Sequence, residues 1–171
     1  MSGTGELADR FMKACAESKV LVATAESCTG GLIIATLTEI PGSSSMVDRG
    51  FVTYSNDAKM EMIGVSKETL DAYGAVSRET ALEMAAGALA HSRAGIALAV
   101  TGIAGPDGGS AEKPVGLVWF GIAVRGHPAH AEKRLFDNQG RDYIRRETVK
   151  TALELGLETL TDRRRGHAPT P

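Results

Sequence analysis

The chain has 171 residues, a formal net charge of −2 and only 5% aromatic residues. This length suits one domain whose core is large enough to fold without disulfides or metals. The near-neutral charge argues against nucleic acid as the main partner, and no stretch has the length and apolar character of a membrane span. We therefore expect neither a nucleic-acid nor a membrane partner, and a core built mainly from aliphatic residues.

The two cysteines, Cys15 and Cys28, have neither the number nor the spacing of a disulfide framework or a metal site. Cys15 lies in an apolar helical pattern, so we expect it in the core. Residues 1–5 show no secretory signal, which would place an apolar segment behind a basic region. Together these features predict a cytoplasmic protein with reduced thiols.

In chain order, the pattern first predicts an amphipathic helix over residues 6–18 and a strand over residues 20–23. A polar stretch, residues 24–31, then leads into a helix over about residues 30–39. A strand, a tight turn and a helix in succession direct backbone N–H groups and a helix N-terminus at one spot, which favours a phosphate or an oxyanion.

The polar stretch offers several groups for chemistry. Ser27, Cys28 and Thr29 are candidate nucleophiles or hydrogen-bonding groups, and Gly30 and Gly31 allow a ligand to approach the backbone closely. The alternative is that these residues only cap the following helix. The combination of a thiol, hydroxyls, a carboxylate and glycines at a strand end favours a site.

The next predicted unit is a strand over residues 47–55 followed by a short helix over residues 56–64. Lys59 falls in the first turn of that helix, where the helix dipole opposes a positive charge. This placement is either chance or a means of lowering the pKa of the lysine. Before this strand, residues 43–45 are expected to form a polar loop.

The residue pattern of the remaining chain predicts a short helix and a longer alanine-rich helix with Ser77 as its N-cap. Three strands and a closing helix are expected to follow. The alanine content of the second helix predicts close packing against a sheet or another helix. The expected ranges are residues 66–73, 77–90, 95–101, 115–124, 129–136 and 142–161. We expect the strand over residues 129–136 to be antiparallel to its predecessor.

These elements predict an α/β fold: a single three-layer domain with a mixed sheet of about five strands and helices on both faces. A second glycine-rich loop, residues 102–110, also follows a strand, so the two loops either face one crevice or the second is only a flexible connection. The closing helix begins with Arg141 and Arg145, which implies a nearby negative group or a surface salt bridge. We expect the domain to span residues 1–161 and residues 162–171 to form a disordered tail.

Five motifs occur in a fixed order along the chain: Ala25-Glu26-Ser27-Cys28-Thr29-Gly30-Gly31, Gly50-Phe51-Val52-Thr53-Tyr54-Ser55-Asn56 with Lys59, Gly74-Ala75-Val76-Ser77, Thr101-Gly102-Ile103-Ala104-Gly105-Pro106-Asp107-Gly108-Gly109, and Lys113-Pro114-Val115-Gly116. In this series the chain resembles the CinA C-terminal domain family over about residues 7–160. The resemblance implies hydrolysis of the carboxamide of nicotinamide mononucleotide to nicotinate mononucleotide and ammonia, without a metal or cofactor. It also implies a homo-oligomer, because the family tends to self-associate.

On the family pattern Ser27 is the nucleophile and Lys59 the general base, and Tyr54 either orients the lysine, relays a proton or only packs the strand end. Burial and nearby arginines are expected to lower the pKa of Lys59. The substrate-binding candidates are Cys28, Thr29, Gly30, Gly31, Thr101, Gly102, Gly105, Arg141 and Arg145. Backbone N–H groups of residues 28–31 are the expected oxyanion donors, and the two arginines are candidates for the substrate phosphate or for setting the lysine pKa.

Two alternatives remain open. Cys28 is a competing nucleophile, but no histidine lies in the turn motifs to activate it, so we favour a packing role. The second alternative is that the chain is a non-catalytic nucleotide-binding module, because such a module also needs glycine-rich loops and arginines. Lys59 distinguishes the two, since a pure binder has no use for a lysine beside a serine.

Overall fold

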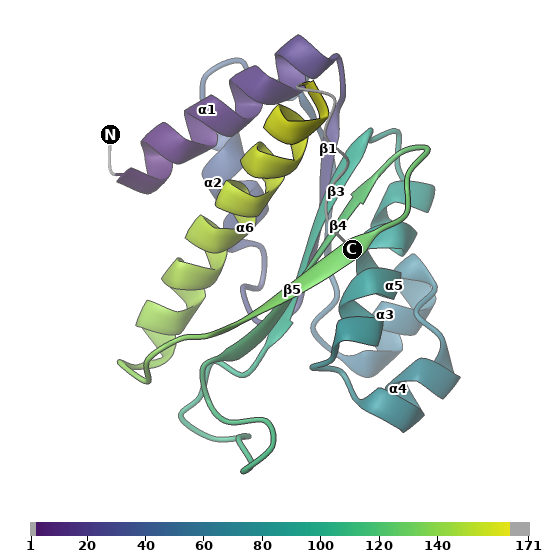
Figure 1. Cartoon of the computed structure of the whole chain (residues 1–171), viewed down its shortest axis with the longest axis vertical. Helices are drawn as coiled ribbons and strands as arrows, with labels where there is room; N and C mark the ends of the chain where they lie inside the picture. Colours follow the sequence, from purple (N-terminus) through teal and green to yellow (C-terminus); the bar gives the residue numbers. More distant parts are fainter. Residues whose placement is uncertain (1–2, 165–171) are drawn as a thin grey trace.

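The computed structural model describes residues 3–164, in which a mixed sheet lies between two layers of helices (Figure 1). The five strands follow the order β2-β1-β3-β4-β5. Strand β1 (Val22–Glu26) pairs in parallel with β2 (Val47–Val52) on one side and with the central strand β3 (Ile96–Gly102) on the other. The sheet continues through the antiparallel strands β4 (Leu117–Val124) and β5 (His130–Leu135). The predicted fold class and the antiparallel last strand are confirmed.

The helices divide evenly between the two faces of the sheet (Figure 1). One face carries α1 (Gly3–Ser18), α2 (Leu32–Thr38) and α6 (Arg141–Arg164). The other carries α3 (Asn56–Ile63), α4 (Lys67–Tyr73) and α5 (Arg78–Ala90). Because successive strand residues point to opposite faces, each helical layer packs on its own set of strand side chains.

The β3 strand shows how the sequence builds two cores of different depth. Ile96, Leu98 and Val100 pack toward α1 and α6, whereas Ala97 and Ala99 pack toward α5. Small side chains on that second face let the alanine-rich helix α5 come close to the sheet, as the sequence predicted. Helix α5 comes so close to β4 that a Cβ added to Gly121 would lie 2.2 Å from the carbonyl oxygen of Ala81, so only glycine fits there.

Several element boundaries differ from those expected. Residues 53–55 follow β2 instead of extending it, and Ser43–Ser45 form a short 3-10 helix, η1, where a loop was expected. The closing helix α6 continues through residues 162–164, which the sequence analysis placed in a disordered tail. The rest of that expected tail, residues 165–171, lies outside the described residues.

The strand β1 is the point at which the chain changes direction across the sheet. From β1 the chain passes through α2 to β2 on one side, and then returns through α3, α4 and α5 to β3 on the other side. In open α/β sheets a ligand site forms at the carboxyl ends of the strands beside such a reversal. The carboxyl ends of β1, β2 and β3 therefore mark where to look for the site.

Candidate active site

A cavity of about 210 Å³ opens at the carboxyl ends of the three parallel strands. Its walls come from the turn after β1, the segment between β2 and α3, the segment between α4 and α5, the loop after β3 and the first residue of α6. The residues that line it are Ser27, Cys28, Tyr54, Asn56, Lys59, Ala75, Val76, Thr101, Gly102, Ala104 and Arg141. Segments far apart in the sequence thus converge on one space, and the two glycine-rich loops do face the same crevice.

Ser27 and Lys59 form a buried polar pair in the cavity. Ser27 directly follows β1, and the hydroxyl of Ser55 caps α3 so that Lys59 lies in its first turn. Lys59 Nζ is 3.0 Å from Ser27 Oγ and also donates to the carbonyl oxygens of Thr53, at 3.0 Å, and Tyr54, at 3.2 Å. Only 1% of Lys59 is exposed. Because an amino group has at most three donors, these acceptors fix its orientation completely.

Burial shifts the proton affinity of this lysine. Removal from water lowers the pKa of Lys59 from 10.5 to about 8, because the charged form loses its hydration, and Cys28 opposes the shift. The predicted direction is therefore confirmed. The arginines expected to contribute do not, since burial alone lowers this pKa.

Tyr54 contributes through two different groups. Its carbonyl oxygen accepts a hydrogen bond from the amine of Lys59, while the residue as a whole is 59% exposed and its phenol accepts a hydrogen bond of 3.0 Å from Arg141 Nη2. The phenol thus neither packs the strand end nor contacts the lysine. Of the roles considered for Tyr54, orienting the lysine is the one the geometry supports, and the main chain performs it.

Glu26 was not among the predicted site residues, although it directly precedes Ser27. Its fully buried carboxylate accepts hydrogen bonds from the hydroxyls of Thr24 and Thr29 and from the backbone N–H groups of Ile33 and Ile34. The N-terminal amides of α2, which we expected to face a substrate anion, are therefore occupied by a side chain of the protein. The sequence did carry a signal for this role, because the first motif places a carboxylate beside hydroxyl groups.

The turn between β1 and α2 is held together by its own residues, and part of it faces away from the cavity. Thr29, Gly30 and Gly31 do not line the cavity, although they were expected to contact a substrate. Gly30 and Gly31 instead have φ values of 59° and 106°, which glycine adopts without strain. The Gly30 N–H donates to the carbonyl of Ser27, so it is not free to bind an oxyanion.

The two arginines of α6 have different surroundings. Arg145 lies outside the cavity and donates to the carbonyl oxygens of Cys28 and Thr29, both at 3.1 Å. It therefore ties α6 to the β1–α2 turn, and both of those guanidinium contacts are with the protein. Arg141, one helical turn earlier, does line the cavity and donates to the Gly105 carbonyl and the Tyr54 phenol.

The loop after β3 supplies part of the wall. Thr101 is buried and donates to the carbonyl of Ala75 at 2.7 Å, which joins the β3 end to the segment before α5. Gly102 lines the cavity, whereas Gly105 does not and contributes only the carbonyl that anchors Arg141. Asn56, Ala75, Val76 and Ala104 also line the cavity and were not among the predicted site residues.

Cys28 lies in the cavity wall but is poorly suited to attack a carbonyl. Burial raises the pKa of its thiol to about 12, so it is protonated near neutral pH. Its packing position agrees with the role favoured from the sequence. Cys15 is fully buried in the core, as predicted.

Within residues 3–164, no three or more His, Cys, Asp or Glu side chains gather in a group able to hold a metal ion. None of the helices over the same residues combines the length and the apolar character needed to cross a membrane.

Known proteins resemble this chain along most of its length. A nicotinamide-nucleotide amidohydrolase, PncC, from Escherichia coli (strain K12) is 48% identical over 149 residues, which cover 87% of this chain and 90% of that protein. A competence/damage inducible protein from Agrobacterium tumefaciens, CihA, has a crystal structure with a TM-score of 0.90 and 55% identity, covering 94% of this chain and 97% of that one.

Other relatives are longer. A protein from Acetivibrio thermocellus named for competence and damage induction is 53% identical over 139 residues, and the chain spans only 33% of its length. The model of the CinA C-terminal domain matches residues 4–160. The chain therefore belongs to the CinA C-terminal domain family.

Proposed function

We propose that this protein hydrolyses the carboxamide of nicotinamide mononucleotide, releasing nicotinate mononucleotide and ammonia. The observation that carries the proposal is the buried amine of Lys59, 3.0 Å from the hydroxyl of Ser27 in a cavity at the switch point of the sheet. The name of the Escherichia coli relative supports the substrate, because it is a nicotinamide-nucleotide amidohydrolase. A serine–lysine pair is one of the arrangements that activates a hydroxyl for acyl transfer.

In the first step, neutral Lys59 takes the proton of Ser27. Two N–H groups of the neutral amine donate to the Thr53 and Tyr54 carbonyls, which leaves its lone pair directed at Ser27 Oγ. Oγ then bonds to the amide carbon. Lys59 returns the proton to the departing nitrogen, the C–N bond breaks, and ammonia leaves an ester on Ser27. Water activated by Lys59 hydrolyses that ester and regenerates the hydroxyl.

The negative oxygen that forms in each step needs hydrogen-bond donors. Among residues 3–164, the backbone N–H groups of Cys28 and Thr29 find no acceptor outside their own residues. They directly follow the nucleophile in the chain, and Arg145 donates to the carbonyl oxygens of the same two residues. Of these two residues only Cys28 lines the cavity, so we assign its amide to the oxyanion site, a narrower set than residues 28–31.

The size of the cavity limits how the substrate lies. Pockets that enclose a whole drug-sized ligand measure roughly 300–1,000 Å³, whereas this one measures about 210 Å³. It therefore accommodates the pyridine ring and its carboxamide, and the ribose phosphate extends toward the rim. Arg141 is exposed at that rim and is the cation we assign to the phosphate.

The proposal is tested by measuring ammonia released from nicotinamide mononucleotide by the purified protein, with and without a chelator. We expect chelator-resistant release that Ser27→Ala abolishes, while Cys28→Ala, the matched change at the next residue, keeps much of the activity. The reverse order of the two variants would refute the serine assignment. No release by the wild-type protein would refute the enzymatic function and favour a binding module.

A further inference from the structure

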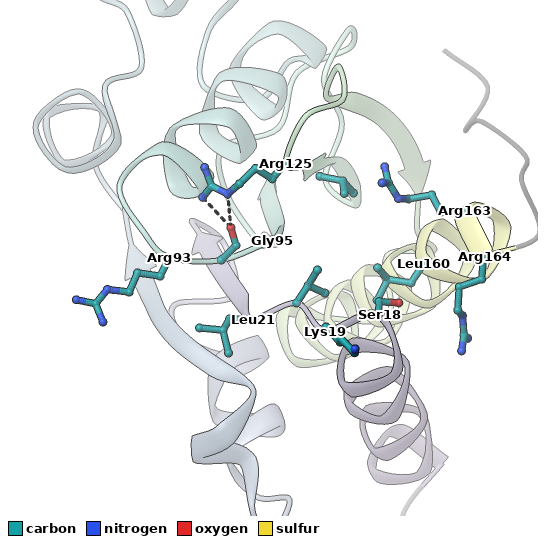
Figure 2. A pocket seen from close by; sticks show the side chains of 12 residues that line it. Ser18, Lys19, Leu21, Arg93, Gly95, Arg125, Leu160, Arg163 and Arg164 are labelled. Atoms are coloured by element: carbon teal, nitrogen blue, oxygen red, sulfur yellow. Dashed lines mark hydrogen bonds between the residues drawn. The ribbon is translucent and has the colours of Figure 1, made fainter.

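A second hollow lies at the opposite end of the sheet from the candidate active site (Figure 2). It measures about 530 Å³ and is bounded by the C-terminal ends of α1 and α6, the segments that precede β1 and β3, and the end of β4. We call it the basic groove, because Lys19, Arg93, Arg125, Arg163 and Arg164 line it and no acidic residue does. The chain as a whole has a net charge of −2, so this concentration of positive charge in one groove requires an explanation.

Part of this charge is neutralised by the protein itself. Arg125 donates through Nε and Nη2 to carbonyls at the end of α5 and in the following loop, including that of Ala94, and Arg164 pairs with Glu17. Cations at helix C-termini also offset the helix dipole. These contacts account for Arg164 and for one side of the Arg125 guanidinium.

The other cations are not accounted for in this way. Within residues 3–164, the side chains of Lys19, Arg93 and Arg163 make no hydrogen bond or ion pair, and Arg125 Nη1 donates to no acceptor. Figure 2 shows Arg163 extending from α6 toward the side of the groove that carries Arg125, while Arg93 extends away from it. Arg163 therefore extends over the groove, and Arg125 lines its opposite side.

Unpaired buried atoms give an independent indication of a missing partner. In the described chain, three buried side-chain polar atoms lack a hydrogen bond, and two of them, Ser18 Oγ and Arg163 Nη1, belong to residues of the basic groove. Buried polar atoms in proteins are almost always paired with protein, water or a bound ion. Both atoms belong to side chains that line the groove, and each can donate a hydrogen bond to an anionic oxygen.

The groove is not polar throughout. Val20, Leu21, Val124 and Leu160 also line it and form an apolar surface beside the cations. Its volume falls within the roughly 300–1,000 Å³ typical of small-molecule sites. Phosphate oxygens bind guanidinium groups well, and an apolar surface next to them suits a flat ring.

We propose that the basic groove binds a phosphorylated small molecule of mononucleotide size, distinct from the substrate in the catalytic cavity. Its phosphate lies among Lys19, Arg125 and Arg163, and its ring rests on Val20, Val124 and Leu160. Seven residues of β3 separate this groove from the catalytic end, a length of about 23 Å at the usual rise of a strand. The site is therefore a separate one.

The test is a calorimetric titration of the full chain with AMP at low salt. We expect saturable binding that Arg163→Gln and Lys19→Gln each weaken about tenfold, the usual cost of a charged hydrogen bond. Lys19 is exposed, so its variant tests the site even if Arg163→Gln were to disturb α6. Arg10→Gln, a matched change on α1 outside the groove, and Arg141→Gln in the catalytic cavity should bind AMP as the wild type does.

Other outcomes would overturn the proposal. Absence of saturable binding at millimolar AMP would remove the site. Loss of binding in Arg141→Gln but not in Arg163→Gln would place AMP in the catalytic cavity, and equal loss in Arg10→Gln would indicate unspecific charge attraction. Inorganic phosphate binding as tightly as AMP would contradict the role given to the apolar surface.

Discussion

The two ends of the sheet differ in how completely their buried charged side chains are paired. At the catalytic end, the amine of Lys59 has an acceptor for each of its three possible donors, and the carboxylate of Glu26 accepts hydrogen bonds from four donors. Within residues 3–164, Ser18 Oγ and Arg163 Nη1 at the other end are buried without partners, and Thr53 Oγ1 is the unpaired buried atom at the catalytic end. The charged side chains of the catalytic end are thus paired within the protein, whereas the guanidinium of Arg163 keeps an unpaired nitrogen among the described residues.

This difference matches what each end is proposed to do. Acyl transfer is fast when the reacting groups and the oxyanion donors are already in place, because no reorganisation is then needed in the transition state. The catalytic end therefore uses protein groups to fix the nucleophile turn. A site that only binds a ligand can leave donors unpaired until the ligand arrives.

The largest effect should come from removing the amine at the catalytic end. Lys59→Met is expected to lower kcat for ammonia release by about 10²- to 10⁴-fold, the usual contribution of general acid–base catalysis. Substrate affinity, measured by calorimetry with nicotinamide mononucleotide, should change little. Lys67→Met, the same change on an exposed helix, is the control, and a Lys59→Met protein that keeps near-wild-type kcat would show that another group is the base.

A smaller effect should follow from disturbing the internal anion. Glu26→Gln replaces an acceptor oxygen by an NH₂ group that faces backbone N–H donors or threonine hydroxyls, so buried donors lose their partner. We expect kcat to fall about tenfold, which corresponds to about 1.4 kcal/mol. KM should stay close to its wild-type value, because Glu26 does not line the cavity.

The matched control is Glu39→Gln, an exposed position that directly follows α2. Thermal unfolding of both variants separates a loss of folded protein from a loss of turnover. If Glu26→Gln raised KM and left kcat unchanged, the carboxylate would act on substrate binding, and its assignment to the turn would be incorrect.

The smallest effect is expected at Tyr54. Its phenol meets Arg141 in solvent, whereas its carbonyl holds Lys59 and is unaffected by a side-chain change. Tyr54→Phe should therefore alter kcat by no more than about threefold, the scale of one exposed hydrogen bond. The measurement is kcat for steady-state ammonia release by Tyr54→Phe. Tyr73→Phe, a change at another exposed tyrosine, is the control. A loss of a hundredfold would instead assign the proton relay to the phenol.

Most of the fold was predictable from local patterns. Alternation of large and small residues in β3 and the alanine content of α5 indicate a sheet with a closely packed helix, and the structure has both. These features depend on residues near each other in the chain.

The hydrogen-bond partners of long side chains were not predictable from local sequence patterns. Arg145 was expected near the substrate, but its guanidinium reaches the carbonyls of Cys28 and Thr29, which lie more than a hundred positions away in the sequence. Glu26 likewise found its donors only after α2 had folded back onto the end of β1. Such contacts depend on how the elements pack, which local patterns do not contain.

The most direct test of the serine–lysine assignment is the pH dependence of kcat/KM for ammonia release from nicotinamide mononucleotide. Lys59 acts as a base only when neutral, and burial places its pKa at about 8. The rate should therefore rise with pH up to about 8 and then level off, because the free enzyme loses the blocking proton over that range. A rate that stays constant from about pH 6 to 10, or that falls as the pH passes 8, would contradict a neutral lysine base.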